Sequence, residues 1–93
     1  MNWSFDETKN VWSLNDGASV ISRIFIKEKP NQVNCFIVKT LLPSIYVSSA
    51  EFKKLTQVGK NWYSMTRKFN TKEKMLTYIE MKKSAVYAQI ERV

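Results

Sequence analysis

The stretch that decides the fold is SVISRIFIKEKPNQVNCFIVKTLL, residues 19–42. Its first part, Ser19–Glu28, is dense in β-branched and aromatic side chains, which favour a strand over a helix. Lys29-Pro30-Asn31-Gln32 is expected to form the next turn, because proline sets φ for its first central position. Residues 33–42 should then form the partner strand. This strand is apolar on both faces around residues 36–38, so we expect it to lie centrally and to be covered, at least in part, on both sides.

The residues before this hairpin predict two more strands. Residues 3–5 and 11–14 are short apolar segments, and the polar residues 6–10 between them fit a hairpin loop. Asn15-Asp16-Gly17 supplies residues that tolerate a positive φ, as a tight or bulged turn requires. The first half of the chain therefore predicts an antiparallel meander.

The residues after the hairpin predict a change of element. Pro43 interrupts the strand, and residues 45–47 are expected to resume it as an edge or bent continuation. Ser48-Ser49-Ala50-Glu51 matches a capping box, which predicts a short helix near residues 49–58 that Gly59 ends. Residues 61–69 alternate again between apolar and polar side chains, and they predict the last strand.

Residues 71–91 predict a long helix that Asn70 caps, with Glu73 in the capping-box position. One helical stripe should pack on the sheet, and it contains Met75, Leu76, Ile79, Val86 and Ile90. A second apolar stripe lies nearly opposite, and it contains Tyr78, Met81, Ala85 and Ala88. We expect this second stripe to meet a copy of the same chain, giving a homodimer. The alternative is a helix held between the sheet and a loop of its own chain.

These elements together predict one α+β domain over residues 1–93. It contains an antiparallel β-meander sheet of roughly four to six strands, a short helix near 49–58, and a long C-terminal helix, 71–91, packed on one face. A chain of 93 residues is long enough for one modest core and too short for two.

The composition excludes most catalytic and metal chemistry. The chain has no histidine and one cysteine, Cys35, so nucleophile–histidine pairs and zinc sites lack their ligands. Neither glycine lies in a phosphate-binding loop. Glu51 and Glu80 each precede a lysine by two residues, as in some magnesium-dependent nucleases, but both fall on expected helices and no aspartate follows Asp16. We therefore expect a protein that is not an enzyme and that holds no metal and no cofactor.

The apolar runs are all far shorter than the ~20 residues that span a bilayer. The first residues also lack the cationic and apolar regions of a signal peptide. We expect a cytoplasmic protein with no membrane partner.

Positive charge is concentrated in the second half of the chain. The formal net charge is +7, and residues 51–93 carry ten cations against four acids. Between Phe52 and Lys72 there is no carboxylate, and aromatic residues lie among the cations. Basic charge interleaved with flat rings is what a phosphate backbone and its bases require.

We therefore expect non-catalytic binding of nucleic acid, with single-stranded DNA or RNA favoured over duplex. The predicted contacts are Arg23, Phe25, Lys27, Lys53, Lys54, Lys60, Trp62, Arg67, Lys68 and Lys72. This interpretation requires that Arg23, Phe25 and Lys27 share one open sheet face with residues 62–68. Otherwise, the rings fill the core and the lysines are simply solvated.

A second hypothesis is a small protein-binding module, an inhibitor or adaptor, that docks on an acidic protein surface. A role in assembly through self-association is a third. Loss of affinity with salt separates the first two hypotheses, because only neutralised phosphates release a condensed layer of counterions.

Overall fold

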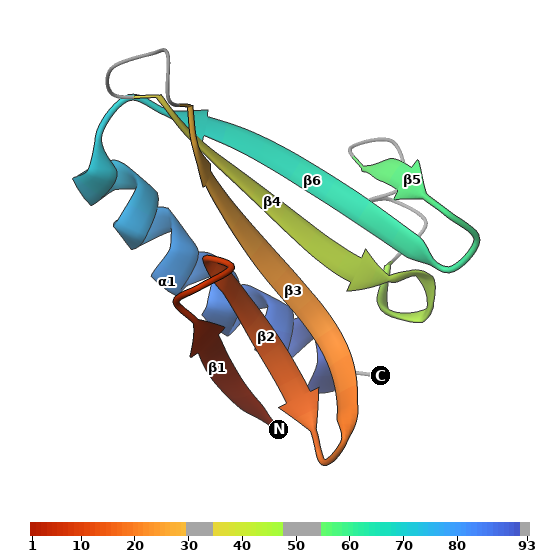
Figure 1. Cartoon of the computed structure of the whole chain (residues 1–93). Helices are drawn as coiled ribbons and strands as arrows, with labels where there is room; N and C mark the ends of the chain where they lie inside the picture. Colours follow the sequence, from red (N-terminus) through yellow and green to blue (C-terminus); the bar gives the residue numbers. More distant parts are fainter. Residues whose placement is uncertain (30–34, 48–54, 92–93) are drawn as a thin grey trace.

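The computed structural model describes residues 1–29, 35–47 and 55–91. These residues form a six-stranded antiparallel sheet in the order β1-β2-β3-β4-β6-β5, and a long helix packs on one face of it (Figure 1). The elements are β1 (Asn2–Asp6), β2 (Val11–Asp16), β3 (Ser19–Glu28), β4 (Phe36–Pro43), the 3-10 turn η1 (Ser44–Tyr46), β5 (Thr56–Val58), β6 (Trp62–Phe69) and α1 (Lys72–Glu91). The predicted α+β fold is confirmed.

The turns of the first half follow from local side-chain chemistry. Asp6 Oδ1 accepts hydrogen bonds from the backbone N–H groups of Thr8 (3.0 Å) and Lys9 (3.2 Å), which reverses the chain after β1. Asn10 completes this turn with a φ of 57°. Between β2 and β3 the positive φ, 61°, falls on Gly17, which has no side chain to oppose it.

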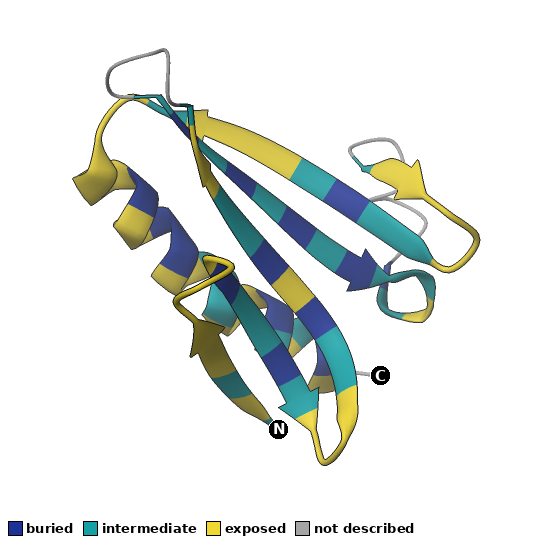
Figure 2. Ribbon diagram, viewed as in Figure 1, coloured by how far each residue is buried: buried dark blue, intermediate teal, exposed yellow. Residues whose placement is uncertain are grey.

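Strand β4 lies between β3 and β6, as the apolar run predicted. Its residues alternate between buried and half-buried along its length (Figure 2). The buried ones are Phe36, Val38, Thr40 and Leu42. The β4 side chains between them face the other way, because successive residues of a strand point to opposite faces.

The core lies between the sheet and α1. Its buried residues form two clusters, one of Ile24, Phe36, Val38, Met75, Tyr78 and Ile79, and one of Leu14, Leu42, Val47, Val86 and Ile90. Each cluster joins one half of the helix to the strands beneath it. Burial of this apolar surface is the main force that holds the helix on the sheet.

The start of α1 differs from the prediction. The Thr71 hydroxyl accepts a hydrogen bond from the backbone N–H of Lys74 (3.2 Å), so Thr71 rather than Asn70 caps the helix. The buried stripe is also displaced in the first half of the helix. Tyr78 is buried there and Leu76 is 49% exposed, the reverse of what the periodicity predicted. The long Tyr78 side chain reaches across to Phe69 of β6, with ring centroids 4.9 Å apart.

Two predictions between β4 and β6 are wrong in detail. Residues 45–47 do not resume the strand, because the Val47 N–H donates to the Ser44 carbonyl (3.2 Å) and closes a 3-10 turn after Pro43. The predicted helix near 49–58 is wrong at residues 56–58, which form β5. Val58 pairs with Trp62 there, and Gly59 has a φ of 70° in the hairpin instead of ending a helix. The capping box and residues 30–34 lie outside the described residues.

Within the described residues, no helix combines the length and the apolar composition that crossing a membrane requires.

Candidate functional site

The sheet has one covered face and one open face. Ile24, Val38 and Thr40 are buried on the side of α1. In an antiparallel pair, residues directly opposite each other point to the same face. The register therefore identifies the side chains of β3, β4 and β6 that point away from the helix.

Three rows of paired residues cross the open face. They are Arg23–Leu41–Ser64, Phe25–Lys39–Thr66 and Lys27–Ile37–Lys68. Trp62 precedes Ser64 by two residues on β6 and so points to the same side. The condition set by the sequence is met in the described residues: Arg23, Phe25 and Lys27 share an uncovered face with Trp62 and Lys68.

Lys39 is a cation of this face that the sequence reasoning missed. It lies between Phe25 and Thr66 in the middle row and is half-buried. A signal for it was present, because Ile37, Lys39 and Leu41 alternate with the buried residues of β4. Once β4 is read as a central strand, Lys39 is its charged residue on the second face.

The open face is concave. Val58 of β5 borders a hollow of about 320 Å³ together with Phe25 and Lys27 of β3, although β4 and β6 lie between these strands. The other residues that line this hollow are Ile37, Lys39, Leu41 and Thr66. A strand at the edge of the sheet reaches residues three strands away only because the sheet curls over its open face.

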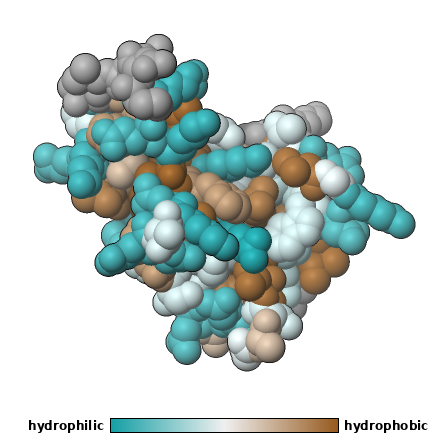
Figure 3. Space-filling view, viewed as in Figure 1, coloured by the Kyte–Doolittle hydropathy of each residue, from teal (hydrophilic) through white to brown (hydrophobic). Residues whose placement is uncertain are grey.

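A second hollow of about 260 Å³ adjoins the first, since Leu41 and Val58 border both. Its remaining walls are Val20, Arg23 and Trp62. We call these two hollows together the open-face trough. The space-filling view shows apolar surface lying among hydrophilic side chains on the side of the molecule drawn in Figure 1 (Figure 3).

The two rings of the trough, Phe25 and Trp62, lie outside the core. Phe25 and Trp62 are each half-buried, and both line the trough. Neither belongs to the two clusters under α1. Part of the surface of each ring therefore faces the trough and not the core.

The trough is positively charged. Arg23, Lys27, Lys39 and Lys68 lie in or beside it, and none of the described residues that line it is a carboxylate. Asp6 borders a neighbouring hollow of about 170 Å³, which shares Arg23 and Phe25 with the trough. Asp6 Oδ1 already accepts hydrogen bonds from two backbone N–H groups. Over the described ranges, the ion pair that forms is Lys83–Glu80 on α1, at 3.1 Å.

The other predicted cations that the structure describes do not join this face. Arg67 points to the helix side, where its guanidinium carbon lies 5.3 Å from the Tyr78 ring centroid and 5.9 Å from that of Phe69. Lys60 is exposed in the β5–β6 turn, and Lys72 is exposed at the start of α1. Lys53 and Lys54 lie outside the described residues.

Of the four residues predicted for self-association, one is buried in the core and three are exposed. Tyr78 is 8% exposed and belongs to the core, so its placement on the outward stripe is wrong. Met81 is 59% exposed, and Ala85 and Ala88 are exposed beside it on the back of α1. Self-association through these three residues stays a prediction.

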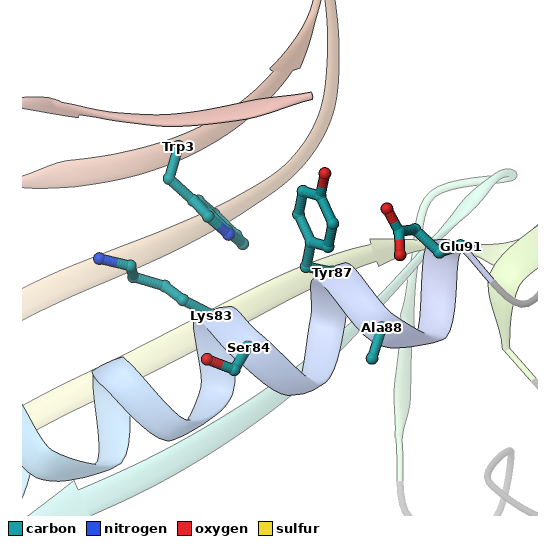
Figure 4. A pocket seen from close by; sticks show the side chains of 6 residues that line it. All are labelled: Trp3, Lys83, Ser84, Tyr87, Ala88 and Glu91. Atoms are coloured by element: carbon teal, nitrogen blue, oxygen red, sulfur yellow. The ribbon is translucent and has the colours of Figure 1, made fainter.

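A separate groove of about 300 Å³ lies between β1 and the second half of α1 (Figure 4). Trp3 and Tyr87 stand on either side of it, and Lys83 and Glu91 border it. One cation and one carboxylate leave the groove without a dominant charge. It is therefore a weaker candidate for an anionic ligand than the trough.

In the parts of the chain that the structure describes, no group of three or more metal-ligating side chains gathers. Comparisons with protein-family models, with curated proteins and with solved structures found no match to this chain. The trough is therefore the feature of the molecule that points to a function.

Proposed function

We propose that this protein binds single-stranded nucleic acid in the open-face trough without catalysing a reaction. The observation that carries the proposal is the position of Phe25 and Trp62 among Arg23, Lys39 and Lys68 on the face that α1 leaves uncovered. Bases stack on exposed rings while cations neutralise the phosphates beside them.

The shape of the trough favours a single strand over a duplex. Its larger hollow is lined by the apolar side chains of Ile37, Leu41 and Val58 together with Lys27 and Lys39. An unpaired base can unstack from its neighbours and turn into such a hollow. In a duplex the bases are already paired and stacked, so only the phosphates would meet the protein.

Fluorescence anisotropy with single-stranded DNA, single-stranded RNA and a duplex of the same sequence tests the proposal. Affinity for single strands should fall steeply with salt, because each neutralised phosphate contributes about 0.7 to the logarithmic slope. Absence of binding to all three probes contradicts the proposal. It would favour an acidic protein as the occupant of the same surface.

Two kinds of substitution separate charge from stacking. Lys68→Ala should lower the affinity for all strand sequences and reduce the salt slope by about 0.7. Trp62→Ala should cost about 1–3 kcal/mol of binding free energy and leave the slope unchanged, whereas Trp62→Phe retains most of the affinity. Lys74→Ala is the matched control, since Lys74 is exposed on α1 away from the trough. Equal losses in Lys68→Ala and Lys74→Ala would show that only net charge matters.

A further inference from the structure

Three lysines occupy neighbouring positions on one face at one end of the trough. Lys27 and Lys68 pair with Ile37 from opposite sides, and Lys39 is the next residue of β4 on the same face. Neighbouring strands lie about 4.8 Å apart, so the Lys27 and Lys68 Cα atoms are separated by about 10 Å. Lys39 is diagonal to both, at about 7–8 Å. Flexible four-carbon stems allow all three ammonium groups to meet above Ile37.

No acid of the described strands neutralises this lysine cluster. Glu28 is adjacent to Lys27 in sequence, but it pairs with the buried residue Phe36 and so belongs to the helix side. The hollow of about 320 Å³ beside the cluster is lined in part by Lys27 and Lys39 and by no carboxylate. The cluster therefore offers three positive charges to one ligand group.

The cluster also lies where the sheet ends. Lys27 is next to last in β3, Ile37 is second in β4, and Lys68 is next to last in β6. Trp62 begins β6 and lies at the opposite end of the trough. A nucleic-acid strand whose end lies at the lysines would therefore pass the hollow beside Phe25 before it reaches Trp62.

We propose that the lysine cluster binds a phosphate monoester at the end of a single strand, with the terminal base in the adjoining hollow. An internal phosphodiester carries one negative charge and two free oxygens. A terminal monoester carries about −1.5 to −2 at pH 7 and three acceptor oxygens, which match three ammonium donors. This inference rests on the proposed function and names the part of a strand that the trough selects.

Oligonucleotides of one sequence test it, carrying a 5′-phosphate, a 3′-phosphate or hydroxyl groups at both ends. One of the phosphorylated strands should bind about tenfold more tightly than the hydroxyl-ended strand, as one added charge-assisted contact provides. The phosphorylated oligonucleotide that binds more tightly identifies which end of the strand, 5′ or 3′, the lysines bind. Equal affinity of all three strands overturns this inference but leaves the proposed function standing. Absence of binding by every strand overturns both.

The pH dependence of the native protein provides a test that needs no variant. The chain contains no histidine, so no ordinary side chain changes charge between pH 5 and pH 8. The second ionisation of the monoester, with a pKa of about 6, lies in this range. Preference for the phosphorylated strand should therefore fall as the pH is lowered from 8 to 5. A preference that is constant over this range contradicts the assignment.

Lys39→Met keeps the apolar stem of the side chain and removes its charge. The variant should lose most of the preference for a phosphorylated end. Lys60→Met removes the same charge from the β5–β6 turn, outside the cluster, and should weaken both strands by the same factor. If Lys39→Met retains the full preference, the lysine cluster is not the monoester site.

Discussion

Arg67 and Lys39 show that a shift of one position along a strand decides which face of the sheet a side chain occupies. Arg67 lies between Thr66 and Lys68, yet it points to the helix side because it pairs with the buried residue Val38. There its guanidinium covers the Tyr78 ring, 5.3 Å from the centroid. Lys39 comes from an apolar run and reaches the open face. Charge in the sequence is therefore a poor guide to the face on which it lies.

The titration of Tyr78 is shifted by its burial, and the Arg67 contact opposes the shift. Burial raises the pKa of its phenol above the ordinary value of 10.0, and the Arg67 guanidinium opposes the rise by favouring the phenolate. A raised folded-state pKa contributes stability that is complete below pH 10. That stability is lost as the pH rises through the folded-state pKa.

The native protein should therefore lose more unfolding free energy above pH 10 than Tyr78→Phe does. Denaturant unfolding at pH 7 and at several values above pH 10 measures this difference. Arg67→Met should raise the pKa of Tyr78 further, since the opposing charge is gone. Parallel stability curves for the native protein and Tyr78→Phe would contradict the assignment.

At the scale of elements, α1 is joined to β2 by a charged contact as well as by the core. Lys83 Nζ lies 3.6 Å from the centroid of the Trp12 ring and 3.1 Å from Glu80 Oε1. The side chain of Lys83 is 15% exposed, and that of Glu80 is 69% exposed. The cation–π contact is thus the better shielded of the two interactions.

Lys83→Met should lower the free energy of unfolding by about 1 kcal/mol, because it removes the charge over the ring and keeps the stem. Glu80→Gln, the control, should change it by less than about 0.5 kcal/mol, as exposed ion pairs do. Denaturant unfolding of both variants provides the comparison. Equal effects would indicate that the ion pair, not the ring, anchors Lys83.

Strand β5 is the element that the local sequence did not reveal. Capping-box chemistry at residues 48–51 favoured a helix through residue 58. Pairing of Thr56 with Ser64 and of Val58 with Trp62 instead extends the sheet by one strand. Since Val58 borders both hollows, this strand gives the trough its second wall. Tertiary pairing therefore overrode a local signal at a position that shapes the candidate site.

At the scale of the whole molecule, the two sides of the sheet have different surroundings. One side is closed by α1 (Figure 1), and the other carries the trough. Within the described residues, the back of α1 carries Met81, which is 59% exposed, with Ala85 and Ala88 exposed beside it. A contiguous apolar stripe on an outer helix surface is a candidate contact with another chain.

The native protein should therefore self-associate at micromolar concentrations, and Met81→Lys should shift it toward monomer because a charge would enter the contact. Sedimentation velocity over a range of concentrations measures both. Thr56→Lys is the control, since Thr56 is exposed on β5, far from the back of the helix. A native chain that sediments as a monomer throughout would remove this prediction.

The sequence by itself determined every strand of the sheet except β5, the long helix and the excess of positive charge. Alternation with a period of two defines strands, a period near 3.6 defines the helix, and both depend only on neighbours along the chain. The absence of histidine likewise restricted the chemistry before any fold was known.

Only the tertiary structure decided which side of each strand α1 covers. Alternation separates the two faces of a strand but does not say which one the helix buries, because both faces of β4 carry apolar side chains. Because α1 packs on the face of Val38 and Thr40, Lys39 lies beside Phe25 on the open face. Arg67 lies against Tyr78 on the helix side. The curl of the sheet, which brings Val58 toward Phe25, depends on pairing between distant segments, and no local pattern encodes it.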